Sequence, residues 1–299
     1  LLSRHATASG AEVREGWEVT RAIFEHDRAV GVEARGEDGV THSVYARVVV
    51  DASGRDAIIA RSLGHVERIP GLDRTALFTQ VRGGWRDAGE RAGDIQIAVC
   101  GDDAERSWFW LIPFADGRTS VGAVVSPAWI KARRDTGGPA DLFAEALRQA
   151  PLVARMLEGS ESLFAPRATP DYSFGVTAMR GEGWIALGDA AGFIDPLFST
   201  GVHLAMVGAL GAADAIDTAL RDDDRGPQRF EAWERDLRAG SALFLAAVQA
   251  FYSGDLIEVL FANPQRPFLR RAITSLLAGD VFRDSRWVRE LRARWGSWS

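Results

Sequence analysis

The sequence is poor in cysteine and lysine, and it lacks any long apolar run. Cys100 is its only cysteine and Lys131 its only lysine. One cysteine excludes an internal disulfide framework and a multi-cysteine metal site, which favours a reducing compartment. No apolar run approaches the roughly 20 residues needed to cross a bilayer, and the first residues lack the charged and apolar regions of a signal peptide. We therefore expect a cytoplasmic protein with no bound metal and no membrane insertion.

Basic residues are also in deficit. The chain has 35 lysines and arginines against 41 aspartates and glutamates, a formal charge of −6, and the two signs are interspersed. Without a basic stripe the chain cannot neutralise a phosphate backbone, which argues against a nucleic-acid partner. With 46% hydrophobic residues in 299 positions, the chain can bury the core of one large or two ordinary domains.

The apolar pattern predicts an α/β chain of α+β character. A helix-like stretch through Ala8 precedes strands at 12–25, 29–36 and 42–50, which form a small β-meander. The last run, 48–50, is typical of a strand buried on both faces of a partly parallel sheet. Strands between 66 and 126 predict a second, antiparallel sheet, with helices over 138–158. A short buried strand from 184, a long helix from about Gly201 and a mainly helical remainder complete the chain.

The candidate site with the strongest signal lies in GWIALGDAAGFIDPLFSTGVHLAM (183–206), where a strand ends at Gly188 and Asp189 and a helix follows. Small residues at 188 and 190–192 let main-chain atoms approach a bulky ligand, while the helix start presents unpaired N–H groups and partial positive charge. The Asp189 carboxylate can accept hydrogen bonds from sugar-like hydroxyls. The alternative is an ordinary strand-to-helix turn that Asp189 caps.

This segment resembles the Gly-Asp motif of the FAD-dependent aromatic hydroxylase superfamily. The resemblance implies that Asp189 contacts the ribityl chain of FAD and that the helix start faces the flavin. Upstream, VVVDASGRDAIIARSLG (48–64) resembles the superfamily's second motif, near the cofactor diphosphate, although DASG alone could be a plain turn. Asp51 and Asp189 are 138 residues apart, in the right order. The cofactor-binding residues implied are Asp51, Gly54, Arg55, Gly188, Asp189, Ala190, Pro196 and Gly201.

The same resemblance implies a Rossmann-like FAD-binding domain of the aromatic hydroxylase type. We expect part of it, with the β-meander, in residues 1–65, and its return segment in residues 181–220. An antiparallel-sheet substrate domain is expected in residues 66–180 and a helical C-terminal region in residues 221–299.

Two further patterns are similar to motifs of flavin-dependent halogenases. The segment Phe193-x-x-Pro196-x-x-Ser199-x-Gly201 resembles the loop that holds halide in that family, which implies chloride or bromide near Ser199, Thr200 and Gly201. A helix N-terminus can supply the N–H donors and positive charge that a small anion needs. The segment Trp108-x-Trp110-x-Ile112-Pro113 resembles the family's Trp-x-Trp-x-Ile-Pro motif, although it could simply be one buried face of a strand. The substrate or tunnel residues implied are Trp108, Trp110, Ile112, Pro113, Phe193 and Phe198.

Two expected features of the family are missing. No glycine-rich first motif for the FAD diphosphate precedes Asp51. The lysine with which halogenases direct the oxidised halogen is also unmatched, because Lys131 does not occupy that position and is expected at the surface. Both absences fit a missing N-terminal portion, so we expect the catalytic lysine upstream of Leu1. This chain alone is expected to bind FAD poorly and not to turn over.

The residue at 198 informs the expected substrate. Halogenases of free tryptophan commonly carry a glutamate where this chain has Phe198. The resemblance is therefore to family members that act on phenols, pyrroles or other natural-product aromatic substrates, some of which are tethered to carrier proteins. It also implies a separate flavin reductase. His203 is either a contact of substrate or flavin or a satisfied core histidine. An aromatic hydroxylase or prenyl reductase of the superfamily, or a non-catalytic scaffold that binds carrier proteins, are the alternatives.

Overall fold

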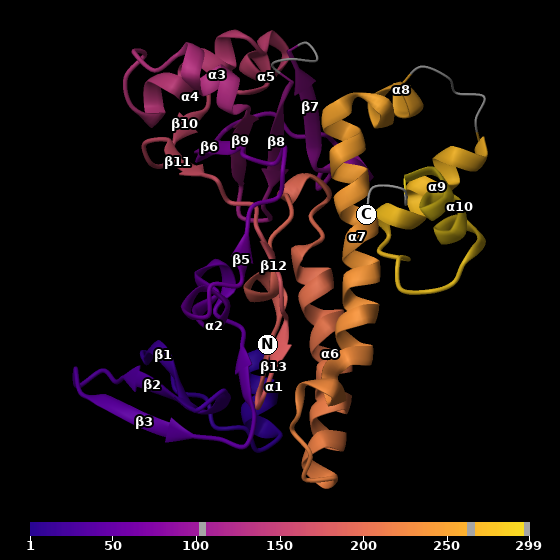
Figure 1. Ribbon diagram of the computed structural model, residues 1–299. Helices are drawn as coiled ribbons and strands as arrows, with labels where there is room; N and C mark the ends of the chain where they lie inside the picture. Colours follow the sequence, from indigo (N-terminus) through magenta and orange to yellow (C-terminus); the bar gives the residue numbers. More distant parts are fainter. Residues whose placement is uncertain (102–105, 262–266, 296–299) are drawn as a thin grey trace. The chain divides into compact units, whose positions relative to one another are not determined.

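The computed structural model describes residues 1–101, 106–261 and 267–295 (Figure 1). The chain forms two compact units. Unit 1 consists of Leu1–Glu67, Gly175–Ala242 and Gly279–Asp284, and unit 2 consists of Arg68–Phe174, Leu243–Ala278 and Ser285–Ser299. Helices, an antiparallel sheet and a small parallel strand pair are all present, which confirms the predicted α/β class of α+β character.

Unit 1 opens with a short helix and a β-meander. Helix α1 (Leu2–Ala8) is followed by the antiparallel strands β1 (Glu18–Glu25), β2 (Arg28–Arg35) and β3 (Thr41–Tyr45). The predicted first strand begins too early, because residues 12–17 lie outside β1. There Glu12 pairs with Arg14 at 2.6 Å, and the Arg14 guanidinium stacks over the Trp17 ring, so these polar side chains interact with each other instead of joining the sheet.

The run 42–50 forms two strands instead of the single one predicted. Strand β3 pairs with β2, whereas β4 (Val49–Asp51) pairs in parallel with β14 (Trp184–Ala186), which lies beside β13 (Arg180–Gly181). Val49 and Asp51 are buried, but 40% of Val50 is exposed, so the prediction of burial on both faces is wrong at this residue. Neighbouring side chains of a strand point to opposite faces, so Val50 lies on the face of β4 opposite to Val49 and Asp51, and this face is the more open one.

The remaining elements of unit 1 are short turns and long helices. The 3₁₀ turn η1 (Gly54–Asp56) and helix α2 (Ile58–Ser62) follow β4, and β5 (Val66–Glu67) pairs with β12 (Gly175–Val176). After β14 the chain forms the 3₁₀ turns η3 (Gly188–Ala191) and η4 (Pro196–Phe198), then helix α6 (Gly201–Arg221), whose start confirms the predicted helix. Turn η5 (Pro227–Phe230) leads to α7 (Glu231–Ser253), which contributes residues up to Ala242 to unit 1.

Unit 2 is built on the predicted antiparallel sheet. The strand order is β10 (Glu161–Ser162), β6 (Thr75–Arg82), β9 (Arg118–Val125), β8 (Ser107–Pro113) and β7 (Gln96–Cys100), and β11 (Arg167–Pro170) also pairs with β6. Turn η2 (Gly89–Arg91) precedes β7. Helices α3 (Pro127–Ala132), α4 (Pro139–Arg148) and α5 (Pro151–Met156) pack on one face of this sheet, where the buried core contains Leu77, Phe109, Leu111, Val121, Trp129, Phe143 and Val153.

The C-terminal part of the chain is helical where the structure describes it. Helices α8 (Asp255–Phe261), α9 (Pro267–Leu277) and α10 (Arg286–Trp295) belong to unit 2, and α9 packs against α10 (Figure 1). In the described ranges no helix combines the length and the apolar character needed to span a bilayer.

Candidate flavin and halide site

The turn after β14 brings the backbone close to helix α6. Gly188 has a φ of +56°, which favours glycine, and a Cβ at this position would lie 3.2 Å from the Cβ of Ala205 in α6. Ala190 is fully buried, so it leaves no side-chain surface for a ligand. The small residues here therefore let the turn and the first part of α6 pack closely together.

The turn after β4 is fixed by its own aspartate. Asp51 is buried, and its Oδ1 accepts hydrogen bonds from the amide (3.0 Å) and hydroxyl (2.5 Å) of Ser53. Its Oδ2 accepts one from the Ile59 amide at 2.8 Å. Gly54, with a φ of +66°, has open space where a Cβ would be. The Asp51 side chain therefore shapes the turn, in which Gly54 is half-buried and Arg55 is exposed.

The fold brings the two turns together although they are 138 residues apart, since η1 packs against η3. Asp189 lies beside the start of α6, because a Cβ on Gly201 would be 3.7 Å from Asp189 Oδ1. Burial raises the pKa of the Asp189 carboxyl above its ordinary value, and the Arg55 guanidinium partly offsets this rise. Within the described residues the Asp189 carboxylate has no hydrogen-bond partner. It is thus a half-buried acceptor available to a ligand.

We expect the variant Asp189→Asn to stabilise the ligand-free protein at neutral pH. A carboxyl whose pKa is raised by folding costs no stability below its ordinary pKa near 3.8, and the cost grows as the pH rises through the raised value. The amide removes this cost, so the melting temperature at pH 7 should rise, and the difference between variant and wild type should vanish near pH 3. Thermal unfolding at both pH values measures this, and equal melting temperatures at pH 7 would contradict the burial effect.

The first backbone amides of helix α6 have no hydrogen-bond partner in the described part of the protein. Asp195 is buried and its Oδ1 accepts a hydrogen bond from the Leu197 amide at 2.9 Å, which starts η4. Ser199 then adopts a φ of +54°, a left-handed conformation that redirects the chain into α6. No side chain caps the helix at Thr200, and the amides of Gly201 and Val202 have no hydrogen-bond partner in the described residues. These amides, with the positive end of the helix, can bind a small anion.

Several predicted residues flank these amides, and one contributor was missed. Thr200 is buried, Ser199 is exposed, and Phe193, Pro196 and Phe198 are half-buried. Asp195 was not among the candidates, although an aspartate directly before a proline is a typical signal for the start of a turn.

His203, in the first turn of α6, binds a distant loop of unit 1. Its Nε2 lies 3.1 Å from the carbonyl oxygen of Gly279, and its ring lies 5.8 Å from the Phe282 ring. Gly279 has a φ of +79°, and a Cβ there would be 2.8 Å from the imidazole. The imidazole therefore packs within the protein, which favours the alternative of a satisfied core histidine.

The motif tryptophans of β8 lie on the sheet face opposite the helix-covered core. Phe109 and Leu111 belong to that core, so the alternating Trp108 and Trp110 point to the other face. Trp108 is 1% exposed and donates from Nε1 to the Tyr252 hydroxyl at 2.9 Å. Trp110 is half-buried and donates to Ser120 Oγ at 3.1 Å, with its ring packed on Gly122. Ile112 and Pro113 are half-buried at the end of the strand.

Other polar candidates do not form a site. Lys131 is exposed in the last turn of α3, as predicted. Among the described residues, histidines, cysteines and acidic residues form no group of three or more suited to a metal ion.

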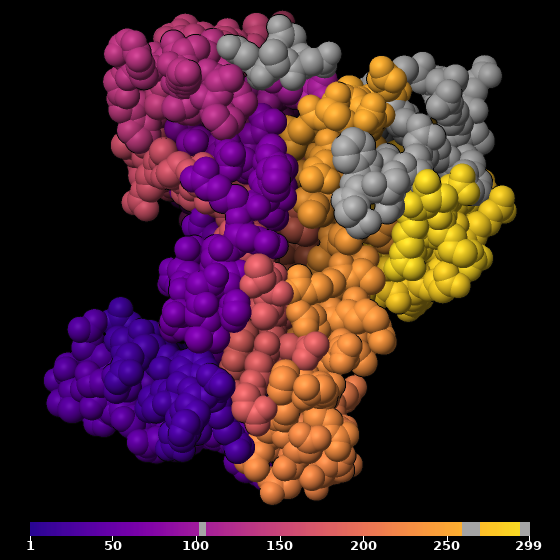
Figure 2. Space-filling model, viewed as in Figure 1, coloured from indigo at the N-terminus to yellow at the C-terminus, as the bar shows by residue number. Residues whose placement is uncertain are grey.

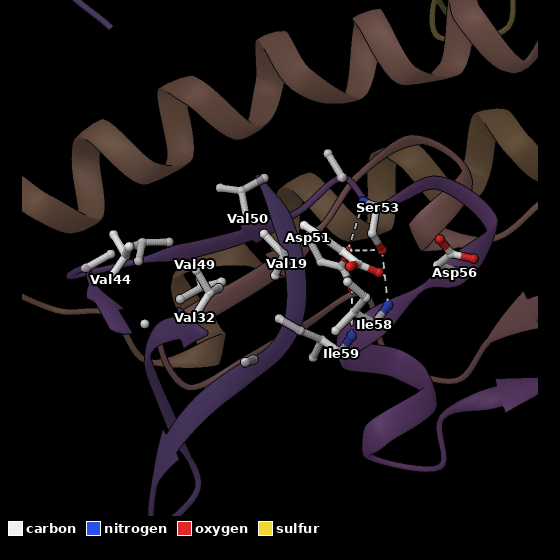
Figure 3. A pocket seen from close by; sticks show the side chains of 16 residues that line it. Val19, Val32, Val44, Val49, Val50, Asp51, Ser53, Asp56, Ile58 and Ile59 are labelled. Carbon is white, nitrogen blue, oxygen red and sulfur yellow. Dashed lines mark hydrogen bonds between the residues drawn. The ribbon is translucent and has the colours of Figure 1, made fainter. Parts of the chain in front are cut away.

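A cavity of about 580 Å³ lies in unit 1 between the meander and the second-motif turn (Figure 3). Val19, Val32 and Val49 give it a mainly apolar wall, and Asp51 and Ser53, bonded to each other, lie at its polar end. Asp189 and Thr200 do not line it. The Gly-Asp turn and the start of α6 therefore lie outside this cavity.

Comparison with known proteins gives consistent results. The family model described as tryptophan halogenase matches residues 1–255. A chlorinase of 1H-pyrrole-2-carbonyl-peptidyl-carrier protein from Pseudomonas fluorescens is 29% identical, with 96% of this chain and 63% of the relative covered. A flavin-dependent halogenase of Armillaria mellea is 34% identical over 72% of this chain and 44% of the relative. The chain thus spans between about two fifths and two thirds of the length of these curated relatives.

Solved structures show the same fold. The flavin-dependent brominase Bmp2 matches with a TM-score of 0.86 at 25% identity, covering 99% of this chain and 73% of that one. The myxobacterial chondrochloren halogenase CndH matches with a TM-score of 0.76 at 31% identity, and the match covers 98% of this chain and 71% of CndH.

Proposed function

This chain belongs to the tryptophan halogenase family, and from that premise we propose that the protein halogenates an aromatic substrate with reduced FAD, dioxygen and chloride or bromide. One observation carries the proposal. Among the described residues the half-buried Asp189 carboxylate has no hydrogen-bond partner, and it lies beside helix amides that also have none there, so an acceptor for hydroxyls and donors for an anion are adjacent.

The residues present fit FAD. The Asp189 carboxylate would accept hydrogen bonds from the ribityl hydroxyls, and the glycine at 201 leaves room for a flat ring at the helix start. Gly54 and Arg55, in the turn that packs against η3, would support the diphosphate end. Bound reduced FAD would supply the reaction with dioxygen that oxidises the halide. The residues of this chain would bind and orient the FAD and would exclude water around it.

Halide binding is assigned to the first turn of α6. The amides of Gly201 and Val202 and the helix dipole would hold the anion, with buried Thr200 and half-buried Phe198 limiting competition from water. For Trp108 and Trp110, both in unit 2, we propose the substrate or tunnel role that the family resemblance implies. Their fixed indoles support this role, since each ring nitrogen is held by a neighbouring hydroxyl.

The substrate we propose is a phenol or pyrrole, in keeping with Phe198 at position 198. Two curated relatives are named for carrier-protein-bound pyrrole-2-carbonyl groups, one a chlorinase and one a brominase, which supports a tethered substrate. We further propose that a separate reductase supplies reduced FAD. A cytoplasmic location, favoured by the single cysteine, completes the proposal.

The test is product analysis with the intact protein, reduced FAD and a phenolic or pyrrolic substrate, with bromide, with chloride and with neither. Halogenated product that requires added halide supports the proposal. A hydroxylated product that forms equally without halide would replace it with monooxygenation, and the absence of flavin binding would favour a non-catalytic role.

The variant Gly201→Val should separate halide use from folding. A Cβ at this position fits, since it would lie 3.7 Å from Asp189 Oδ1, but the added methyl groups would crowd the amides of the first turn. We expect the KM for halide to rise about tenfold, as for one lost anion contact of about 1.4 kcal/mol. Folding should not suffer from helix propensity, because valine has a higher helix propensity than glycine. Gly201→Ala is the matched control. Equal losses of stability and of halide use in both variants would argue against a halide site.

A further inference from the structure

The last two helices differ in charge from the rest of the chain. Helices α9 and α10 contain six arginines and one carboxylate, Glu290, whereas the whole chain has a formal charge of −6. The pairing of α9 with α10 brings this positive charge together within unit 2. Such a local excess of positive charge in an acidic protein attracts a negatively charged partner and raises its rate of association.

The arginines whose side chains the structure describes point outward. We name as the arginine face Arg270 and Arg271 of α9 and Arg286, Arg289 and Arg292 of α10, all exposed. The opposite sides of these helices are buried, through Ala272, Ile273 and Leu276 in α9 and Val288 and Leu291 in α10. Figure 2 shows the outer surface of this C-terminal region in yellow. Because the apolar sides are used in packing, the helices cannot bury them in a membrane.

Ion pairs among the described residues leave three of the five arginines of this face unneutralised. Within the described residues Arg270, Arg271 and Arg292 have no ion-pair partner. Some arginines outside this face lie against carboxylates, for example Arg133 against Glu145 and Arg229 against Asp224. Within the face, the Arg286 guanidinium lies 5.8 Å from the centre of the half-buried Trp287 ring. Arginine and tryptophan together are the residue types that dominate binding energy in protein interfaces.

We propose that the arginine face docks an acidic protein, the carrier domain that presents the tethered aromatic substrate. This rests on the proposed function and adds the surface through which the partner is recognised. Exposed guanidinium groups bind carboxylates with two hydrogen bonds and accelerate association at low salt. A protein partner is favoured over nucleic acid because the chain as a whole repels polyanions, with its net charge of −6.

The experiment compares two triple variants of the intact protein that change the charge equally. Arg270→Glu, Arg271→Glu and Arg292→Glu reverse the face, and Arg47→Glu, Arg134→Glu and Arg155→Glu reverse exposed arginines outside it. The probe is an acidic peptidyl-carrier domain bearing pyrrole-2-carbonyl-phosphopantetheine, titrated by fluorescence anisotropy at 50 and 300 mM salt. We expect the face variant to raise the Kd at least about tenfold at low salt, the control to change it less than about twofold, and the difference to shrink at high salt.

The outcomes separate this inference from the proposed function. Binding requires no turnover, so loss of binding only in the face variant supports the docking surface even if the halide assay fails. Equal loss in both variants, or wild-type binding that is independent of salt, would overturn it. Wild-type binding to vesicles of phosphatidylserine with none to the carrier domain would also overturn it. As a folding control, the face variant should keep the wild-type melting temperature and FAD affinity.

Discussion

The variant Asp189→Ala in the intact protein is expected to bind FAD about 10- to 100-fold more weakly than wild type. A hydrogen bond to a charged acceptor contributes about 1.5–3 kcal/mol, and the ribityl hydroxyls would lose this acceptor. Asp189 has no hydrogen-bond partner among the described residues, so its removal breaks no hydrogen bond within that part of the protein. The loss should therefore fall on the ligand. Quenching of flavin fluorescence on titration with protein measures the Kd.

Asp27→Ala is a suitable control, because Asp27 is an exposed residue of the β1–β2 turn in the same unit. It should leave the FAD affinity unchanged within about twofold, the spread expected of a neutral surface substitution. If Asp189→Ala retains the wild-type Kd, Asp189 does not contact the ribityl chain. The helix start would then have to bind the cofactor without it, and the proposed arrangement of acceptor and amides would fail.

The local signals of the Gly-Asp turn were predictable from the sequence. Glycine at 188 and small residues after it are required where a turn packs against a helix, and the structure has a φ of +56° at Gly188 and a helix from Gly201. The contact between the Gly-Asp turn and the turn after Asp51 was not predictable from composition. It followed only from the family resemblance, because a contact between segments 138 residues apart leaves no local pattern.

The strand errors have a physical cause as well. A run of β-branched residues favours an extended backbone, but it does not determine which other strand the run pairs with. The run 42–50 therefore predicts a single strand. In the structure it forms two, because β3 pairs with β2 and β4 pairs with β14. The exposure of Val50 could not be read from its apolar neighbours either, since it depends on which elements cover that face of β4.

The ion cluster around Glu234 is a second feature without a local signal. Glu234, 9% exposed, accepts hydrogen bonds from the Met179 amide at 3.2 Å and from Arg180 Nε at 2.6 Å. It also accepts one from Arg238 Nε at 2.9 Å, one turn further along α7. Arg180 and Arg238 in turn donate to the carbonyl oxygens of Pro227 and Val176. One carboxylate therefore connects α7 to the backbone on both sides of β13.

Glu234→Gln is expected to lower the free energy of unfolding by about 3 kcal/mol at pH 7, because removing one member of a buried ion cluster leaves uncompensated charge. The expected fall in melting temperature is about 6–12 °C. Glu231→Gln is the matched control on the same helix, since Glu231 is exposed. Chemical unfolding with both variants measures the difference, and a loss as small as that of the control would show that the cluster contributes little.

The pH dependence gives this prediction a second arm. Burial by itself raises the pKa of Glu234, but hydrogen bonds from Arg238, the Met179 amide and Arg180 outweigh burial and hold the pKa below its ordinary value of 4.5. A lowered pKa in the folded state adds stability that is present above pH 4.5 and is lost as the pH falls through the lowered value. The stability gap between wild type and Glu234→Gln should therefore be constant from pH 6 to 8 and narrow below pH 4.5. A gap that stays constant down to pH 3 would mean that the glutamine disturbs packing, and that the charge of Glu234 does not stabilise the fold.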